Sequence, residues 1–207
     1  MTVDGGASAL AYFIMGRSAN SRNRVFVERD GAIFTAPIDA ARVKDPSLII
    51  YPALIACGAT TIVTNGVQTD AIVDGLAAGR SFETVLRGWE YEPDFPHYTP
   101  RISAVVKHGA YRLSILRKLH SSTMRAFWEF EGLPGVAHLI HTYAGDGDPL
   151  PSFTGDPVEV VVDDDLDAWT AGIWSGLDAA NRVALFTRFI PLDGRPTITR
   201  IINGRQL

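Results

Sequence analysis

Three arginines lie close together in a polar stretch near the start of the chain. The stretch runs from Gly16 to Arg24, between two apolar runs, and contains Arg17, Arg22 and Arg24. An arginine side chain stays charged and presents a planar fork of N–H donors, which matches the geometry of a phosphate group. The stretch is therefore a candidate anion site, although a solvated basic loop would have the same composition.

A second candidate site is the segment 64–70, which reads Thr-Asn-Gly-Val-Gln-Thr-Asp. A β-rich run ends there, the chain turns at Gly66, and a helix begins near Thr69 or Asp70. Backbone N–H groups and side-chain amides such as that of Asn65 gather at a helix N-terminus, where they can bind an anion or a carbonyl group. An Asn-Gly turn followed by a helix cap would explain the same residues structurally.

A third candidate is an acidic loop that is followed by an arginine. Glu92 and Asp94 precede Pro100 and Arg101. A glutamate held in such a loop could act as a general base, and the proline would restrict the local backbone. The structural alternative is a loop that is closed by salt bridges.

Other residues that often carry chemistry do not form convincing sites. His138 and His141 lie in an apolar stretch that predicts a strand, where side chains three positions apart point to opposite faces. We therefore expect no shared metal ion. Cys57 is the only cysteine, so no internal disulfide can form, and we expect it to be a buried structural residue in a reducing compartment.

Periodicity and turn signals predict the elements that must position these residues. The expected strands are 10–15, 25–27, 32–35, 60–64, 102–106, 111–117, 123–130, 136–143, 157–162, 183–190 and 197–202, with Asp30-Gly31 as a hairpin turn. The expected helices run from Thr69 or Asp70 to about residue 78, from Ser81 onward, and from about 166 to 177. Many strands without βαβ alternation indicate an α+β fold with more than one sheet layer.

The bulk composition is that of an ordinary globular protein. The chain has 207 residues, of which 46% are apolar and 20% charged, and no composition shift marks a linker, so we expect one domain over residues 1–207. A net charge of −4 argues against nucleic acid as a partner but not against a small anion. The chain has no basic leader and no apolar run long enough to span a membrane, so we expect a cytoplasmic protein without a membrane partner. A homo-oligomer is compatible with these properties.

Taken in order, several motifs resemble those of the IMP cyclohydrolases first known from archaea, and especially their bacterial relatives. The resembling stretches are 11–27, 44–51, 62–70, 91–94, 98–102, 141–143 and 149–153. The likeness extends over nearly the whole chain for the bacterial form and is confined mainly to the first half for the archaeal form. Several motifs in the right order are more specific than any one of them.

The resemblance implies a four-layer αββα sandwich of the Ntn-hydrolase type, without the N-terminal nucleophile of that superfamily. Thr2 is not expected to be such a nucleophile, because the first predicted strand begins near Leu10. The family reaction joins the carboxamide nitrogen of a formamidoimidazole-carboxamide ribotide to its formyl carbon and loses water to give IMP. The implied partner is a purine-type nucleotide, and the implied reaction requires no metal or redox cofactor.

The resemblance also implies roles for residues in the matching motifs. The implied catalytic residues are Tyr51, which could donate to an oxyanion, Glu92, which could manage protons, and Asn65. The implied substrate-binding residues are Arg17, Arg22, Arg24, Asp70 and Arg101, with Arg24 as the principal substrate contact.

Three alternatives remain open at this point. The chain could act on an analogous ribotide in a specialised nucleoside pathway. It could also be a purine-nucleotide-binding protein without turnover, because only nine residues precede Leu10 where the family usually has a further strand. Amide hydrolysis of an unrelated substrate rests on fold analogy alone.

Overall fold

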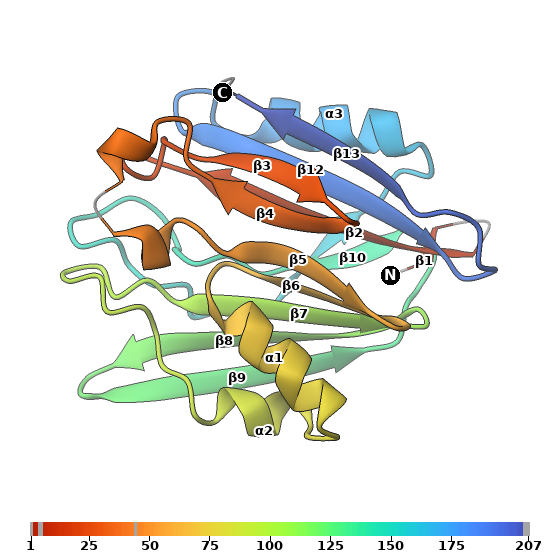
Figure 1. Ribbon diagram of the computed structural model, residues 1–207, viewed down its shortest axis with the longest axis horizontal. Coiled ribbons are helices and arrows are strands. Elements are labelled where there is room, and N and C mark those ends of the chain that lie inside the picture. Colours follow the sequence, from red (N-terminus) through yellow and green to blue (C-terminus); the bar gives the residue numbers. More distant parts are fainter. Residues whose placement is uncertain (1, 4–5, 44, 205–207) are drawn as a thin grey trace.

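The computed structural model describes residues 2–3, 6–43 and 45–204 and consists mostly of antiparallel strands with few helices (Figure 1). This outcome confirms the predominance of strands and the presence of more than one sheet that the sequence predicts.

The larger sheet has seven strands in the order in which they occur along the chain. They are β3 (Val25–Arg29), β4 (Ala32–Ala36), β5 (Pro52–Cys57), β6 (Thr60–Thr64), β7 (Arg101–Lys107), β8 (Ala110–Leu119) and β9 (Ser122–Phe130). The predicted turn between β3 and β4 is present, and Asp30 and Gly31 have φ values of 51° and 76°. Two consecutive residues with positive φ match the right-handed twist of the flanking strands.

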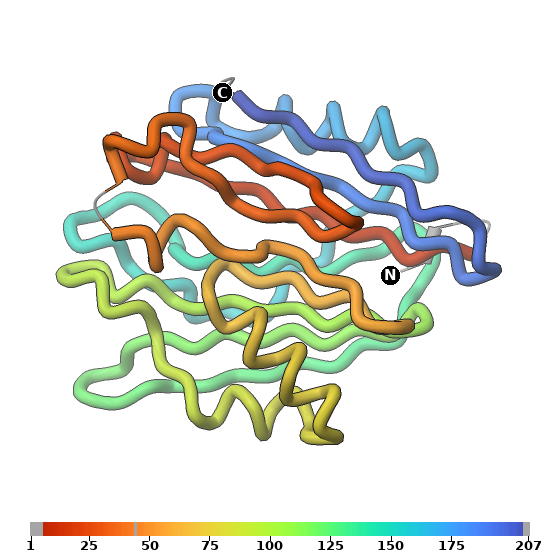
Figure 2. Tube along the Cα trace, viewed as in Figure 1, coloured from red at the N-terminus to blue at the C-terminus, as the bar shows by residue number. Residues whose placement is uncertain are grey.

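The smaller main sheet joins the two ends of the chain. Its strands lie in the order β1 (Thr2–Val3), β2 (Ala7–Met15), β12 (Arg182–Pro191) and β13 (Ile198–Asn203). Figure 2 shows the red N-terminal strand beside the blue C-terminal strands. The strand that the sequence predicts from Leu10 therefore begins earlier, because residues from Ala7 onward pair with the end of β12.

The helices cover different sheets. Helices α1 (Gln68–Ala77) and α2 (Phe82–Leu86) share a hydrophobic cluster with strands of the seven-stranded sheet, whereas α3 (Leu166–Gly176) packs on β12 and β13. The predicted Ser81 cap is present, since its side chain accepts from the Thr84 N–H, and Asp165 caps α3 in the same way. The cap predicted at Thr69 or Asp70 is wrong, because α1 begins at Gln68 after Val67 and has no side-chain cap. None of the helices in the described residues has the length and hydropathy that a membrane crossing would need.

An aromatic cluster joins the two main sheets. The ring centroids of Phe26 on β3 and Phe186 on β12 are 4.9 Å apart, and Tyr12 on β2 packs edge-on or tilted against both rings. Ile33 and Leu54 of the large sheet are fully buried in the same cluster. This core fixes β2 relative to the start of β5, where several candidate site residues lie.

Two further expectations from the sequence are wrong. The strand predicted over 136–143 ends at Leu139 as β10 (Val136–Leu139), which pairs with β11 (Val158–Val161). The chain beyond it folds on itself instead, because the Ala144 N–H donates to the Pro151 carbonyl and Phe153 N–H donates to the Thr142 carbonyl. Cys57 is exposed rather than buried, because it ends β5 at a hairpin turn beyond the core.

Candidate active site

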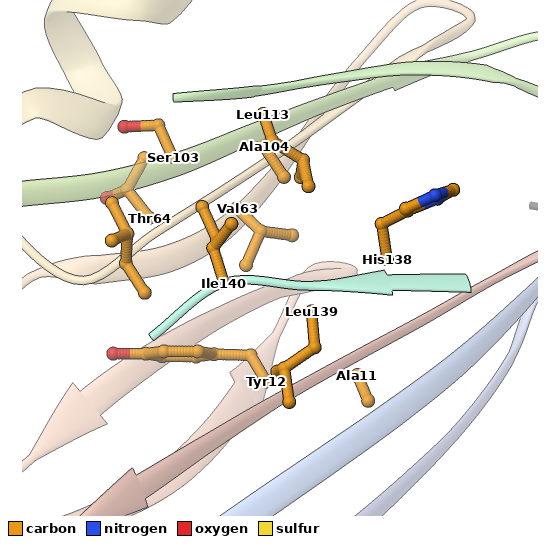
Figure 3. Close-up of a pocket in the computed structure, with 11 residues that line it drawn as sticks. Ala11, Tyr12, Val63, Thr64, Ser103, Ala104, Leu113, His138, Leu139 and Ile140 are labelled. Atoms are coloured by element: carbon orange, nitrogen blue, oxygen red, sulfur yellow. The ribbon is translucent and has the colours of Figure 1, made fainter. Parts of the chain in front are cut away.

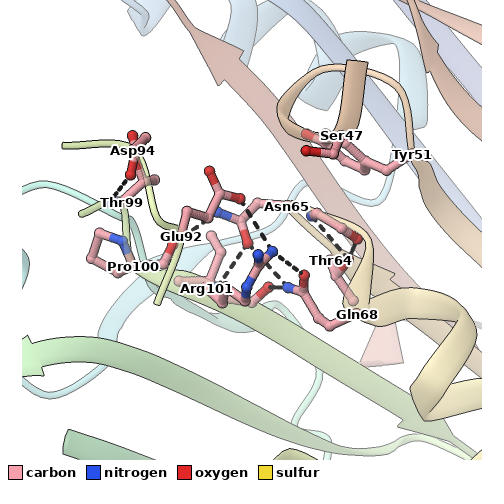
Figure 4. A network of polar contacts seen from close by, with 12 residues as sticks. Ser47, Tyr51, Thr64, Asn65, Gln68, Glu92, Asp94, Thr99, Pro100 and Arg101 are labelled. Carbon is pink, nitrogen blue, oxygen red and sulfur yellow. Dashed lines mark hydrogen bonds and ion pairs between the residues drawn. The ribbon is translucent and has the colours of Figure 1, made fainter. Parts of the chain in front are cut away.

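Four of the eight candidate residues, Tyr51, Asn65, Glu92 and Arg101, lie near one another where central strands of the seven-stranded sheet begin or end, at the edge that these strand ends form (Figure 4). Thr64 ends β6 and pairs with Ser103 on the antiparallel strand β7. The end of one strand and the start of the next therefore lie side by side, which brings Asn65 next to Arg101. The loop that carries Glu92 returns to the same edge, where the Glu92 N–H donates to the Thr99 carbonyl over 2.9 Å.

Glu92 and Arg101 form a buried ion pair. Arg101 Nη1 lies 3.3 Å from Glu92 Oε1, and each side chain is only 8% exposed. Arg101 Nη1 also donates to Gln68 Oε1 over 3.0 Å, and the guanidinium carbon lies 5.3 Å from the centre of the Trp89 ring. Arg101 Nε is buried and has no hydrogen-bond partner among the described residues.

Gly66 makes room for this pair. A Cβ atom at Gly66 would lie 2.5 Å from Arg101 Nη1 and 3.0 Å from Glu92 Oε1. Real Cβ contacts are longer than this, so any side chain here would push the ion pair apart. Gly66, which the sequence predicts to be a turn residue, therefore also allows Glu92 and Arg101 to lie close to the start of α1.

Burial controls the protonation of Glu92. Removal from water raises the pKa of Glu92 from its ordinary value of 4.5 to about 8, while the positive charge of Arg101 opposes the shift. Burial also lowers the pKa of Arg101. A carboxyl group that titrates near neutral pH can both accept and return a proton within one reaction cycle.

Asn65 is bonded to the polypeptide at both ends of its side-chain amide. Its Nδ2 donates to the Pro100 carbonyl over 2.9 Å, and its Oδ1 accepts from the Ile102 N–H over 2.9 Å. Oδ1 also accepts from Gln68 Nε2 over 3.2 Å. Asn65 therefore clamps the residues on either side of Arg101.

Tyr51, directly before β5, lies in the same electrostatic neighbourhood as Glu92. Its side chain is buried, and its hydroxyl oxygen lies 3.0 Å from that of Tyr12. Burial raises the pKa of Tyr51, the charge of Arg24 lowers it, and the charge of Glu92 raises it. Arg24 also lowers the pKa of Glu92. Tyr51, Glu92 and Arg24 are therefore near enough for their charges to influence one another.

The three arginines of the polar stretch have different surroundings. Arg24 Nε donates to the Ser21 carbonyl, and its charge acts on Tyr51 and Glu92. Arg22 is engaged with the polypeptide, since it donates to the Gly16 carbonyl and to Asn181 Oδ1. Arg17 is exposed and forms an ion pair with Asp146.

Asp70 is exposed in the first turn of α1 and is not among the groups whose charges act on Glu92 or Tyr51.

Sequence reasoning assigned no role to several polar residues at this edge. Gln68 is fully buried and lies on the same helical face as Ile72, a position where a buried glutamine signals a polar network. Tyr143 approaches Thr99, which in turn contacts Asp94, and burial raises the pKa of Tyr143 to about 12. The loop that carries Tyr143 folds back on itself, and no local sequence pattern predicts this conformation.

A cavity of about 90 Å³ lies between the two main sheets beside this network (Figure 3). Tyr12, Thr64 and Ser103 contribute hydroxyl groups at one end, and His138 lies at the other end of its largely apolar wall. The Ser103 hydroxyl is buried without a hydrogen-bond partner in the described part of the chain. His138 and His141 have separate partners, Tyr111 and the Tyr143 carbonyl.

Comparison with known proteins gives a family match over almost the whole chain. Residues 1–194 match the family described as IMP cyclohydrolase-like protein. A protein of Methanopyrus kandleri named IMP cyclohydrolase is 31% identical over 107 residues, which cover 50% of this chain and 52% of that protein. One of Natronomonas pharaonis with the same name is 34% identical over 106 residues, covering 49% and 54%. The matched region thus spans about half the length of each of these relatives.

Proposed function

Because the chain belongs to the IMP cyclohydrolase-like family, we propose that it is an IMP cyclohydrolase that closes the ring of 5-formamidoimidazole-4-carboxamide ribotide. The observation that carries this proposal is the buried Glu92–Arg101 pair, with Glu92 titrating near neutral pH beside Tyr51 and Arg24. We also assign the fold to the four-layer Ntn-hydrolase type, since α3 packs on one main sheet and α1 and α2 on the other.

The chemistry requires one new C–N bond and the loss of one water molecule. The carboxamide nitrogen attacks the formyl carbon, and the formyl oxygen becomes an oxyanion. This oxygen leaves as water after it takes one proton from the attacking nitrogen and one from the formamide N–H, whose nitrogen then forms the C=N double bond of the ring. An amide nitrogen is a poor nucleophile, but the reaction is intramolecular, so holding the reactive conformer supplies much of the acceleration. Proton transfer and oxyanion stabilisation must supply the rest.

The site residues suit these steps. Ionised Glu92 takes the proton from the attacking nitrogen and, as the acid, returns it to the leaving oxygen. The Tyr51 hydroxyl donates to the oxyanion, and Arg24 binds the nucleotide through charge-assisted hydrogen bonds. Arg101 sets the ionisation of Glu92, because its charge favours the carboxylate over the acid.

The remaining candidate residues receive supporting roles in this proposal. Both ends of the Asn65 amide are bonded to the polypeptide, so we assign it to holding Arg101 in place. Arg17 and Arg22 are assigned to the rim of the nucleotide site, and Asp70 to the helix start. No step requires a cofactor.

The test is direct. Purified protein is mixed with the formamido ribotide, and ring closure is followed by ultraviolet absorbance, with Glu92→Gln as the inactive control. We expect turnover that persists in EDTA and after alkylation of Cys57. Tight binding of IMP without turnover would identify a nucleotide-binding protein instead, and turnover only of an analogous ribotide would assign the chain to a specialised pathway.

A further inference from the structure

Tyr12 contacts the proposed oxyanion donor from the opposite sheet. It lies on β2, whereas Tyr51 precedes β5 of the large sheet, and their hydroxyl oxygens are 3.0 Å apart. This hydrogen bond therefore crosses between the two sheets. From the sequence alone Tyr12 would be interpreted as a core residue, because it lies within the apolar run 10–15.

The ring of Tyr12 is held on its sides. Its centroid lies 5.6 Å from that of Phe26 and 5.7 Å from that of Phe186, at tilted and edge-on angles. In Figure 3 the side chain runs along the cavity and its hydroxyl lies at the same end as Thr64. Packing thus fixes the direction in which the Tyr12 hydroxyl points.

The direction of the bond decides what Tyr51 can do. A tyrosine hydroxyl has one proton to donate, while its oxygen can accept. If Tyr51 gave its proton to Tyr12, it could not donate to an oxyanion. At 3.0 Å either hydroxyl could be the donor. Burial raises the pKa of Tyr12 well above its ordinary value, whereas the charge of Arg24 opposes the effect of burial more strongly at Tyr51, so Tyr12 is the partner that keeps its proton.

We propose that Tyr12 is a positioning residue, whose hydroxyl donates to the Tyr51 oxygen and so directs the Tyr51 proton toward the substrate. A donated hydrogen bond also polarises the acceptor's own O–H group, which makes Tyr51 a stronger donor. The role in catalysis rests on the proposed function, but the hydrogen-bond direction does not.

The kinetic test uses Tyr12→Phe, which removes only the hydroxyl. We expect kcat to fall roughly 5- to 10-fold, the loss of one hydrogen bond, with KM within about twofold. In a Tyr51→Phe background the same substitution should have almost no further effect, because the two changes remove one interaction. Tyr111→Phe is the matched control, since it also removes a buried hydroxyl that bonds a neighbour, His138. Unchanged kcat, or an equal loss in both backgrounds, would overturn the catalytic role.

A spectroscopic test separates this inference from the proposed function. Tyrosines labelled with ¹³C at Cζ give six resonances, one for each tyrosine of the chain, and Tyr51→Phe identifies that of Tyr51. In Tyr12→Phe a smaller fraction of Tyr51 should be ionised at a given alkaline pH, whether or not the protein has cyclohydrolase activity. An unchanged titration of Tyr51, with the variant still folded by circular dichroism, would show that Tyr12 is not the donor.

Discussion

Glu92→Gln tests the buried ion pair without changing the shape of the side chain. Burial raises the pKa of Glu92 from 4.5 to about 8 in the folded protein. A carboxyl group whose folded pKa exceeds its unfolded pKa contributes stability that is complete below the unfolded value and is lost as the pH rises through the folded value. We therefore expect the wild-type protein to lose stability between about pH 4.5 and pH 8 on account of this residue.

The size of the effect follows from the separation of the two pKa values. One pKa unit corresponds to about 1.4 kcal/mol, so the shift from 4.5 to about 8 corresponds to at most about 5 kcal/mol of unfolding free energy. Glutamine does not titrate and lacks this dependence. It leaves Arg101 without the counter-charge that ionised Glu92 supplies at high pH, but this leaves the stability of the variant itself independent of pH over this range because Arg101 stays charged.

The measurement is urea denaturation of both proteins at pH 5, 7 and 9. The free energy of unfolding of Glu92→Gln, relative to wild type, should rise by several kcal/mol between pH 5 and 9. Glu129→Gln, which replaces an exposed carboxylate on β9, is the control. A stability difference between Glu92→Gln and wild type that stays constant with pH would refute the reasoning.

In the enzyme assay, Glu92→Gln should lower kcat about 10²- to 10³-fold, and wild-type activity should rise with pH up to about 8 if the carboxylate is the base.

Three further substitutions test the rest of the site. Arg24→Ala should weaken IMP binding about 10- to 100-fold in a titration, since a charge-assisted contact is worth roughly 1.5–3 kcal/mol; unchanged affinity with a lower melting temperature would assign Arg24 to the fold. Tyr51→Phe should lower kcat about 10²- to 10³-fold at similar KM in steady-state kinetics, because its hydrogen bond matters most in the transition state; full activity would exclude the tyrosine. Gly66→Ala should destabilise the protein by roughly 1–3 kcal/mol and reduce turnover, because its Cβ would displace the Arg101 guanidinium. Gly172→Ala, which points into open space on α3, is the control, and equal melting temperatures of the two variants would contradict this explanation.

The elements that the sequence predicts well are those with local signals. The Asp30-Gly31 turn, the Ser81 cap and the amphipathic α3 each depend on residues within a few positions of one another. The physical causes, a positive φ, an unsatisfied N–H group and an apolar helical face, are all local.

The elements that the sequence misses depend on distant pairing. Strand β5 begins at Pro52 and gives no clear period-two pattern, yet it forms because β4 and β6 supply partners on both sides. The pairing of β2 with β12 joins the two ends of the chain and has no local signature. The prediction that Cys57 is buried is wrong for the same reason. Only the position of the hairpin end relative to the core decides whether Cys57 is exposed.

The candidate site shows the same division between residue types and their environment. The acidic loop and the following arginine are visible in the sequence as possible catalytic groups. Their ionisation is not, because the shift in the pKa of Glu92 arises from burial that the fold creates. Gln68 and Gly66 come from the start of α1, and Trp89 follows the end of α2, so two separate segments contact the Arg101 guanidinium. Glu92 can therefore transfer protons near neutral pH only because the fold brings these segments together and buries its carboxyl group. For this reason, substitutions of Gly66 and Tyr12, which the sequence interprets as turn and core residues, are the sharper tests of the proposed chemistry.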